Sequence, residues 1–125
     1  GSLRDRFYEN IQKAQVEGMI AGVHCRPSVE AAAEFPDNYF DIVFIDADHH
    51  YEAVKADLEA WYPKVKPGGI ISGHDFVWDH PVSQAGVIRA VLEFFADKPL
   101  EVMSTGRVWK SIKYADEIKR VRTWI

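Results

Sequence analysis

Apolar residues recur along this chain at two spacings, one typical of helices and the other of buried strands. Residues 3–14 place apolar side chains at helical spacing between charged ones and predict an amphipathic helix, with Gly18 as a stop signal. Short apolar runs then predict three strands, at 19–24, 40–45 and 70–72, and Lys66-Pro67-Gly68-Gly69 predicts a turn just before the third. Each predicted strand is followed by a helical pattern. The first runs over 29–35, the second carries Val54, Leu58 and Trp61 and ends near Tyr62, where Pro63 prevents continuation, and the third runs over 87–95.

The order of these elements predicts an α/β fold with a mainly parallel sheet. Strands that alternate with helices need crossover connections, and right-handed crossovers place the three intervening helices on one face. Two later apolar runs, 100–104 and 108–114, flank Thr105-Gly106-Arg107 and predict an antiparallel hairpin, before a last helix around 118–125. We therefore expect one Rossmann-like domain over 3–125, and Gly1-Ser2 is typical of an expression-vector remnant.

The stretch that follows the predicted strand at 40–45 is the best-placed candidate site. The strand itself is expected to be buried on both faces, because five of its six residues are apolar and three of those are β-branched. It runs directly into Asp46, Asp48, His49 and His50. Ligands of open parallel sheets bind beyond the carboxyl ends of the strands, where this polar cluster lies. The alternative is that Asp48 only caps the next helix and the histidines are solvated.

Composition narrows the class of protein. Apolar residues make up 47% and charged residues 27% of the chain, as in soluble globular domains. The formal net charge of −4 gives no electrostatic reason to expect nucleic acid or an anionic membrane as a partner. No stretch resembles a membrane span or a signal peptide. The lone Cys25 has no internal disulfide partner, so we expect a packed thiol and a cytoplasmic location.

Residues 44–76 carry a resemblance to a known family: FIDADHHYEAVKADLEAWYPKVKPGGIISGHDF. This stretch resembles the second half of class I S-adenosylmethionine-dependent methyltransferases, most closely the small bacterial branch related to catechol-type O-methyltransferases. The D-A-D at 46–48 and the P-G-G at 67–69 stand where that family carries the motifs of its fourth and fifth strands. The resemblance runs from about Leu3 to Tyr114. It implies methyl transfer from S-adenosylmethionine to a small-molecule acceptor, and so an enzyme.

Three features of the family are missing or altered. The sequence contains no G-x-G loop for the methionine part of the cofactor and no acidic end of a second strand for the ribose. Cys25-Arg26-Pro27-Ser28 stands where members usually carry an acidic residue beside the adenine. The chain therefore resembles a truncated class I fold that begins before the family's third strand, and we expect it alone to be weakly active or inactive. The alternative is a non-catalytic fragment that self-associates or binds metal.

The resemblance also implies a metal site. The metal-dependent members hold a divalent cation at the positions that match Asp46, Asp75 and Phe76 in this chain. Phe76 has no ligating atom, so His74 or His49 is the candidate to complete the set. Two carboxylates suit Mg²⁺ or Ca²⁺, whereas an added histidine favours Zn²⁺, Mn²⁺ or Fe²⁺. The alternative is that both carboxylates only accept hydrogen bonds from loop amides.

The same resemblance suggests catalytic and cofactor residues. His49 stands where the family often has a lysine that removes the acceptor's proton, and an ordinary imidazole pKa of about 6.5 suits a general base. Asp46 is expected to act beside it, and a solvated histidine at a helix start is the alternative. The candidate residues for the cofactor are Asp46, Asp48 and Ser28, of which Ser28 is also the expected N-cap of the helix at 29–35.

The strand at 40–45 raises a question of partners. Without the family's first two strands it would be an apolar edge strand, which invites pairing. Two solutions stay open: the strand at 19–24 lies beside it, or two chains pair edge to edge or exchange their N-terminal elements. We expect self-association, as a homodimer or larger, because the helix at 3–14 would otherwise cover one face of the sheet almost alone.

Overall fold

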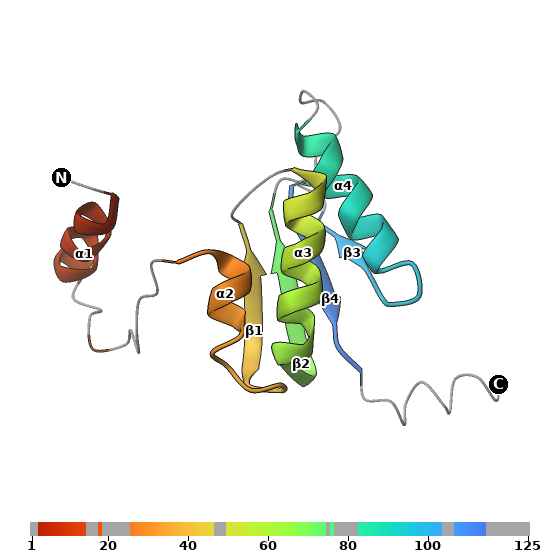
Figure 1. Cartoon of the computed structure of the whole chain (residues 1–125), viewed down its shortest axis with the longest axis horizontal. Helices are drawn as coiled ribbons and strands as arrows, with labels where there is room; N and C mark the ends of the chain where they lie inside the picture. The colour runs from red at the N-terminus through yellow and green to blue at the C-terminus, as the bar shows by residue number, and fades with distance from the viewer. Residues whose placement is uncertain are drawn as a thin grey trace.

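A computed structural model describes residues 3–14, 18, 26–46, 50–74, 76, 83–103 and 107–114 (Figure 1). The helices are α1 (Leu3–Ala14), α2 (Ser28–Ala32), α3 (Tyr51–Trp61) and α4 (Ser83–Phe94), and a 3₁₀ turn, η2 (Tyr62–Lys64), follows α3. The strands are β1 (Phe40–Ile45), β2 (Val65–Gly73), β3 (Glu101–Val102) and β4 (Trp109–Ile112). The predicted strand at 19–24 and the predicted last helix lie outside the described residues.

The described strands form one mixed sheet in the order β1-β2-β4-β3. β1 runs parallel to β2, whereas β4 is antiparallel to both β2 and β3. The Met103 N–H donates to the Val108 carbonyl oxygen over 2.8 Å and extends the β3–β4 pairing toward the turn. The α/β fold and the closing antiparallel hairpin are therefore confirmed.

Helices α2, α3 and α4 all cover the same face of this sheet (Figure 1). For α3 this agrees with a right-handed crossover between the parallel strands β1 and β2. α3 packs between the other two, and Pro63 follows its end as expected. None of the described helices has the length and apolar character needed to cross a membrane. The core between helices and sheet is built from Ile45, Val54, Leu58, Val65, Ile71, Phe76, Val87, Ile88, Ala90, Val91, Phe95 and Trp109.

The expectation that β1 is buried on both faces is wrong for the described structure. Ile45 is buried and Val43 packs against the core, but Ile42 and Phe44 are 64% and 54% exposed. Successive side chains of a strand point to opposite faces, and the described helices that pack on the sheet cover only one of them. β1 is also the edge of the described sheet. An apolar run therefore signals burial only where elements cover both sides of the strand.

The Pro-Gly-Gly segment is not a separate turn before a strand but part of β2. Val65 already pairs with Phe40, and the register then shifts before Ile42 meets Ile70. Gly68 has φ +85°, which favours glycine. A Cβ on Gly69 would lie 2.7 Å from the carbonyl oxygen of Asp41. The two glycines thus allow an irregularity inside the strand, where the pattern had predicted a turn.

Candidate functional site

The register of β1 and β2 brings two polar side chains to one rim of the sheet. Ile45 pairs with Gly73, and the N–H of His74 donates to the carbonyl oxygen of Ile45 over 3.3 Å. Asp46 is exposed and His74 is half-buried, and each follows the end of its strand. Parallel strands with aligned carboxyl ends are the arrangement expected for a ligand site in this type of sheet. We call this end of the sheet, where the carboxyl ends of β1 and β2 lie side by side, the rim.

Two of the predicted site residues at the rim, His49 and Asp75, lie outside the described residues, as does Asp48. The placement of Asp75 beside Asp46 therefore stays a prediction, as do the proposed base and the proposed cofactor contact of Asp48. The structure does show that β1 and β2 are adjacent, parallel and end together.

Close packing of Trp109 on Gly73 holds the end of β2. The two residues are paired across β2 and β4, and Trp109 is 1% exposed. A Cβ at position 73 would lie 2.5 Å from Cζ2 of the indole, so a larger residue does not fit there. On the neighbouring residue, Ser72 Oγ donates to the carbonyl oxygen of Trp109 over 2.7 Å. The residues after Gly73 thus start from a strand end that is fixed on β4.

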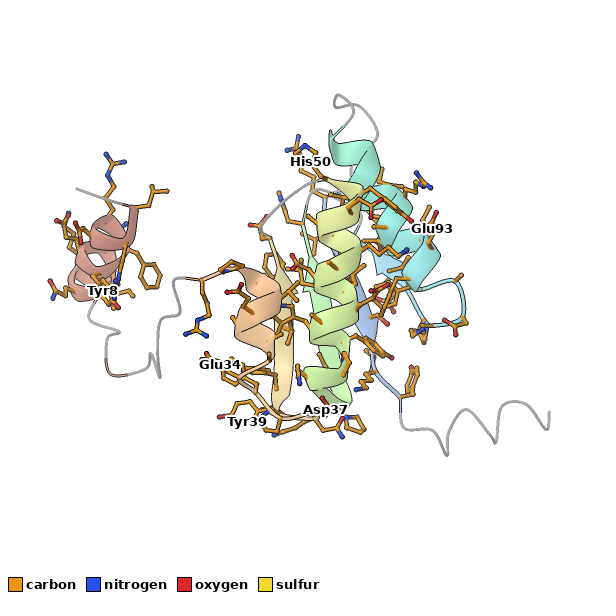
Figure 2. The ribbon with its side chains drawn as sticks, viewed as in Figure 1. Tyr8, Glu34, Asp37, Tyr39, His50 and Glu93 are labelled. Carbon is orange, nitrogen blue, oxygen red and sulfur yellow. The ribbon has the colours of Figure 1, made fainter. Side chains whose placement is uncertain are left out.

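α3 begins at the same end of the sheet as the rim. His50 lies at the upper end of α3 in Figure 2, and its carbonyl oxygen accepts a hydrogen bond from Val54 N–H over 3.0 Å. The imidazole of His50 is exposed and does not cap the helix with a side-chain hydrogen bond. His50 thus presents an exposed imidazole at the start of α3, at the same end of the sheet as the rim.

A polar cluster joins the start of α3 to α4, and we call Tyr51, Arg89 and Glu93 the α3–α4 cluster. The hydroxyl of Tyr51 donates to Glu93 Oε2, and Arg89 Nε donates to Glu93 Oε1 over 3.1 Å. The Arg89 guanidinium lies 4.2 Å from the centroid of the Tyr51 ring. The hydrogen bond to Glu93 raises the pKa of Tyr51, and the same bond lowers the pKa of Glu93. The cluster therefore holds a neutral phenol and an ionised carboxylate.

Sequence reasoning missed this cluster. Arg89 and Glu93 stand four residues apart on α4, which is a recognisable spacing for an ion pair. Tyr51 is forty-two positions from Glu93, and no local pattern connects them. Long-range packing of α3 on α4 is what brings the three side chains together.

Phe76 stands at a position that the family resemblance assigns to a metal ligand. Its side chain belongs to the hydrophobic core, and its N–H donates to the carbonyl oxygen of Arg107 over 3.2 Å. Among the described residues, no three His, Cys, Asp or Glu side chains lie together as a metal site. Asp46 and His74 supply two donors at most within this part of the chain. The described residues alone do not fit a cation, and the proposed set needs Asp75.

Ser28 is not the N-cap of α2, contrary to expectation. The helix begins at Ser28, Pro27 occupies the cap position, and no side-chain hydrogen bond caps the helix. The hydroxyl of Ser28 instead accepts a hydrogen bond from Trp61 Nε1 over 2.7 Å. Ser28 thus contacts the last residue of α3, whereas Asp46 precedes the first residue of that helix. These two proposed cofactor residues therefore lie toward opposite ends of α3. Beside Ser28, Arg26 pairs with Glu34 over 2.7 Å.

An α/β sheet with polar residues at the carboxyl ends of adjacent parallel strands defines a ligand-binding domain of the Rossmann-like class. Comparison with protein families narrows this class. The model of the methyltransferase domain family matches residues 3–76, which is more than half of the chain. The chain therefore belongs to the methyltransferase domain family, within the class I S-adenosylmethionine-dependent group.

Solved structures support the same fold. A crystal structure of a Corynebacterium glutamicum protein aligns with 86% of this chain and 54% of its own, with a TM-score of 0.69 and 13% identity. A candidate O-methyltransferase from Klebsiella pneumoniae aligns with 86% of this chain and 56% of its own, with a TM-score of 0.64 and 20% identity. This chain thus spans little more than half the length of these two proteins. At these identities the likeness shows the fold.

The alignments with two further relatives cover a smaller share of both chains. The apo structure of a TDP-rhamnose 3′-O-methyltransferase of calicheamicin biosynthesis aligns with 67% of this chain and 36% of its own, with a TM-score of 0.50 and 25% identity. The protein y4gI of Sinorhizobium fredii is 39% identical over 46 residues, which are 37% of this chain and 5% of that protein.

Proposed function

We propose that this chain takes part in methyl transfer from S-adenosylmethionine to a small-molecule acceptor, with its ligands at the rim. The observation that carries the proposal is the pairing of Ile45 with Gly73, which places Asp46 and His74 at one edge of a methyltransferase domain. Both parallel strands end there, and ligands of such sheets bind at this edge. The solved relatives described as O-methyltransferases support oxygen as the acceptor atom.

The chain has a residue for the polar groups of the cofactor but no loop for its methionine part. S-adenosylmethionine supplies a methyl group activated on a positive sulfur. Asp46 offers an exposed carboxylate that can accept hydrogen bonds from a hydroxyl or ammonium group. The sequence holds no glycine-rich loop for the methionine part. We therefore propose weak cofactor binding by this chain alone, with His49 as the base that takes the acceptor's proton.

A divalent cation at the rim is part of the same proposal. Asp46, Asp75 and His74 are the proposed ligands, and the cation would lower the proton affinity of the acceptor hydroxyl. Phe76 packs in the core and cannot join them. The register of β1 and β2 supports this set as far as Asp46 and His74 are concerned.

Calorimetric titration of the full chain with S-adenosylmethionine tests the proposal. We expect measurable binding, which Asp46→Asn weakens by about tenfold, the loss of one charged hydrogen bond. Asp41→Asn is the matched control, because Asp41 is also an exposed carboxylate of β1 but lies near the other end of the strand, 3.3 Å from Lys66. No heat at millimolar cofactor, or equal weakening by both variants, would contradict the proposal.

A second candidate function is a non-catalytic module that associates with itself. The exposure of Ile42 and Phe44 on the edge strand favours it. The two candidates separate in one preparation: a chain that self-associates but leaves S-adenosylmethionine unbound at millimolar concentration is the module, not the enzyme.

A further inference from the structure

The side chain of Tyr51, the first residue of α3, is held on α4. Its ring packs against the hydrophobic core, and the guanidinium of Arg89 lies 4.2 Å from the ring centroid. Its hydroxyl donates to Glu93 Oε2, and Glu93 Oε1 accepts the Nε–H of Arg89 over 3.1 Å. Both partners belong to α4, where Figure 2 labels Glu93. One side chain therefore fixes the start of α3 on the neighbouring helix.

The connection from β1 to α3 runs between two fixed residues. It consists of residues 46–50. Before it, Ile45 is buried, and its carbonyl oxygen accepts a hydrogen bond from His74 N–H over 3.3 Å. After it comes Tyr51, held on α4. Fixed ends reduce the number of conformations that so short a segment can adopt. The connection contains Asp46 and His49, the carboxylate and the base of the proposed function.

The helix that holds Tyr51 is itself the next helix after the second rim strand. α4 follows β2 along the chain as α3 follows β1, and the two helices pack on each other. Both begin at the rim end of the sheet (Figure 1). The bond from Tyr51 to Glu93 therefore ties the end of one rim connection to the helix that follows the other rim strand.

The α3–α4 cluster is a weak source of stability. The side chains of Arg89 and Glu93 are 66% and 51% exposed, and exposed ion pairs contribute little to folding. The Tyr51 hydroxyl adds a contact between helices at the residue where the connection from β1 ends. Its place in the fold, and not its strength, is what distinguishes this bond.

We propose that Tyr51 is a positioning residue for methyl transfer. Its hydrogen bond to Glu93 fixes the point at which the connection from β1 enters α3, and so holds Asp46 and His49 in the arrangement that the ligands need. Tyr51 acts through the connection and not by contact with the cofactor. A site that is ordered before binding binds more tightly, because the ligand does not have to order it. The inference rests on the proposed function.

A double-mutant cycle, read by calorimetric titration of the full chain with S-adenosylmethionine, tests the role of Tyr51. Tyr51→Phe keeps the ring and loses only the hydroxyl, and we expect its Kd to rise about three- to tenfold. Glu93→Ala should raise Kd similarly, and the double variant should be no weaker than either single variant, because all three lack the same contact. Glu93→Gln keeps a carbonyl acceptor for the hydroxyl and should bind as the parent does.

Lys113→Met separates positioning from stability in the same titration. Lys113 donates to the carbonyl oxygens of Tyr62 and Val65, where α3 has ended and β2 begins, so its loss destabilises the fold far from the rim. This variant should bind S-adenosylmethionine as the parent does. Weakening by Lys113→Met as large as that by Tyr51→Phe, or additive losses in the cycle, would overturn the inference. So would unchanged binding by Tyr51→Phe, which leaves the proposed function standing. A parent that does not bind overturns the proposed function, and the inference falls with it.

Hydrogen exchange without any ligand gives a second readout. Val54 N–H donates to the carbonyl oxygen of His50 in the first turn of α3, and Tyr62 N–H donates to that of Leu58 at the other end. In Tyr51→Phe we expect the Val54 amide to exchange about three- to tenfold faster and the Tyr62 amide to be unchanged, because only the start of the helix is released. Equal rates at Val54 in both proteins, or equal acceleration at both amides, would overturn the inference.

Discussion

The indole of Trp109 lies so close to Gly73 that a Cβ at position 73 would stand 2.5 Å from ring atom Cζ2. The contact sits at the strand end that leads to the rim. Because Trp109 is buried among core residues, it has little room to move away from an added methyl group. The glycine is therefore required by the space available.

Gly73→Ala should lower the free energy of unfolding by about 1–3 kcal/mol, the usual cost of overpacking a core. Urea denaturation followed by tryptophan fluorescence measures the change. Gly18→Ala is the control, because nothing lies within 4 Å of a Cβ at that position, and it should change stability by less than about 0.5 kcal/mol. Equal stability of Gly73→Ala and the parent would show that the Trp109 indole can move to make room for the methyl group.

The hydrogen bond from Tyr51 to Glu93 predicts a pH window of stability. It lowers the pKa of Glu93 below its ordinary 4.5, so this contribution is present above pH 4.5 and is lost as pH falls through the lowered pKa. It raises the pKa of Tyr51 above its ordinary 10.0, so that contribution is present below pH 10.0 and is lost as pH rises through the raised pKa. Stability from this contact is therefore greatest between these limits.

Tyr51→Phe removes the contact and keeps the ring. We expect its Tm to lie below that of the parent by a constant amount across the window, and the difference to shrink in more acidic and more alkaline solution. Calorimetric scans over a range of pH measure this. Tyr39→Phe serves as the control, since Tyr39 is an exposed tyrosine whose described side-chain contacts are made by its ring. A Tyr51→Phe difference that stays the same at every pH would refute the assignment.

Lys113 is predicted to hold the connection between α3 and β2. Its Nζ donates to the carbonyl oxygens of Val65 over 2.8 Å and Tyr62 over 3.2 Å. Lys113→Met keeps much of the side-chain length and leaves these carbonyls without their donor, so we expect a loss of about 1–3 kcal/mol in denaturation experiments. Lys66→Met, which breaks only the exposed pair with Asp41, should cost less than about 1 kcal/mol. Similar losses in both variants would argue against the role of Lys113.

Local patterns predicted the elements whose causes are local. The periodic apolar side chains of residues 3–14 predicted α1, and Pro63 predicted the end of α3. Both signals act over only a few neighbouring residues. The turn residues between β3 and β4 predicted their pairing for the same reason. Parallel pairing of β1 with β2 followed from a single crossover helix, α3.

The errors arose where distant parts of the chain decide the outcome. Ile42 and Phe44 belong to an apolar run, yet their exposure depends on which helices reach that face. Ser28 has the residue type of a helix cap, but Trp61 engages its hydroxyl from another helix. Likewise the turn expected before β2 gave way to pairing of Val65 with Phe40. None of these contacts can be predicted from the residues next to it in the sequence.

Asp46 is the rim residue on which the proposed cation depends most directly. Calorimetric titration of the full chain with Mn²⁺ should show binding that Asp46→Ala weakens by about tenfold or more, because a carboxylate ligand is lost. His74→Ala should shift the preference from Mn²⁺ toward Mg²⁺, since an imidazole ligand favours transition metals. Asp41→Ala should bind Mn²⁺ as the parent does, because its carboxylate lies near the other end of β1 and pairs with Lys66. Equal Mn²⁺ affinity in the parent and Asp46→Ala would remove the cation from the rim and leave Asp46 with a hydrogen-bonding role alone.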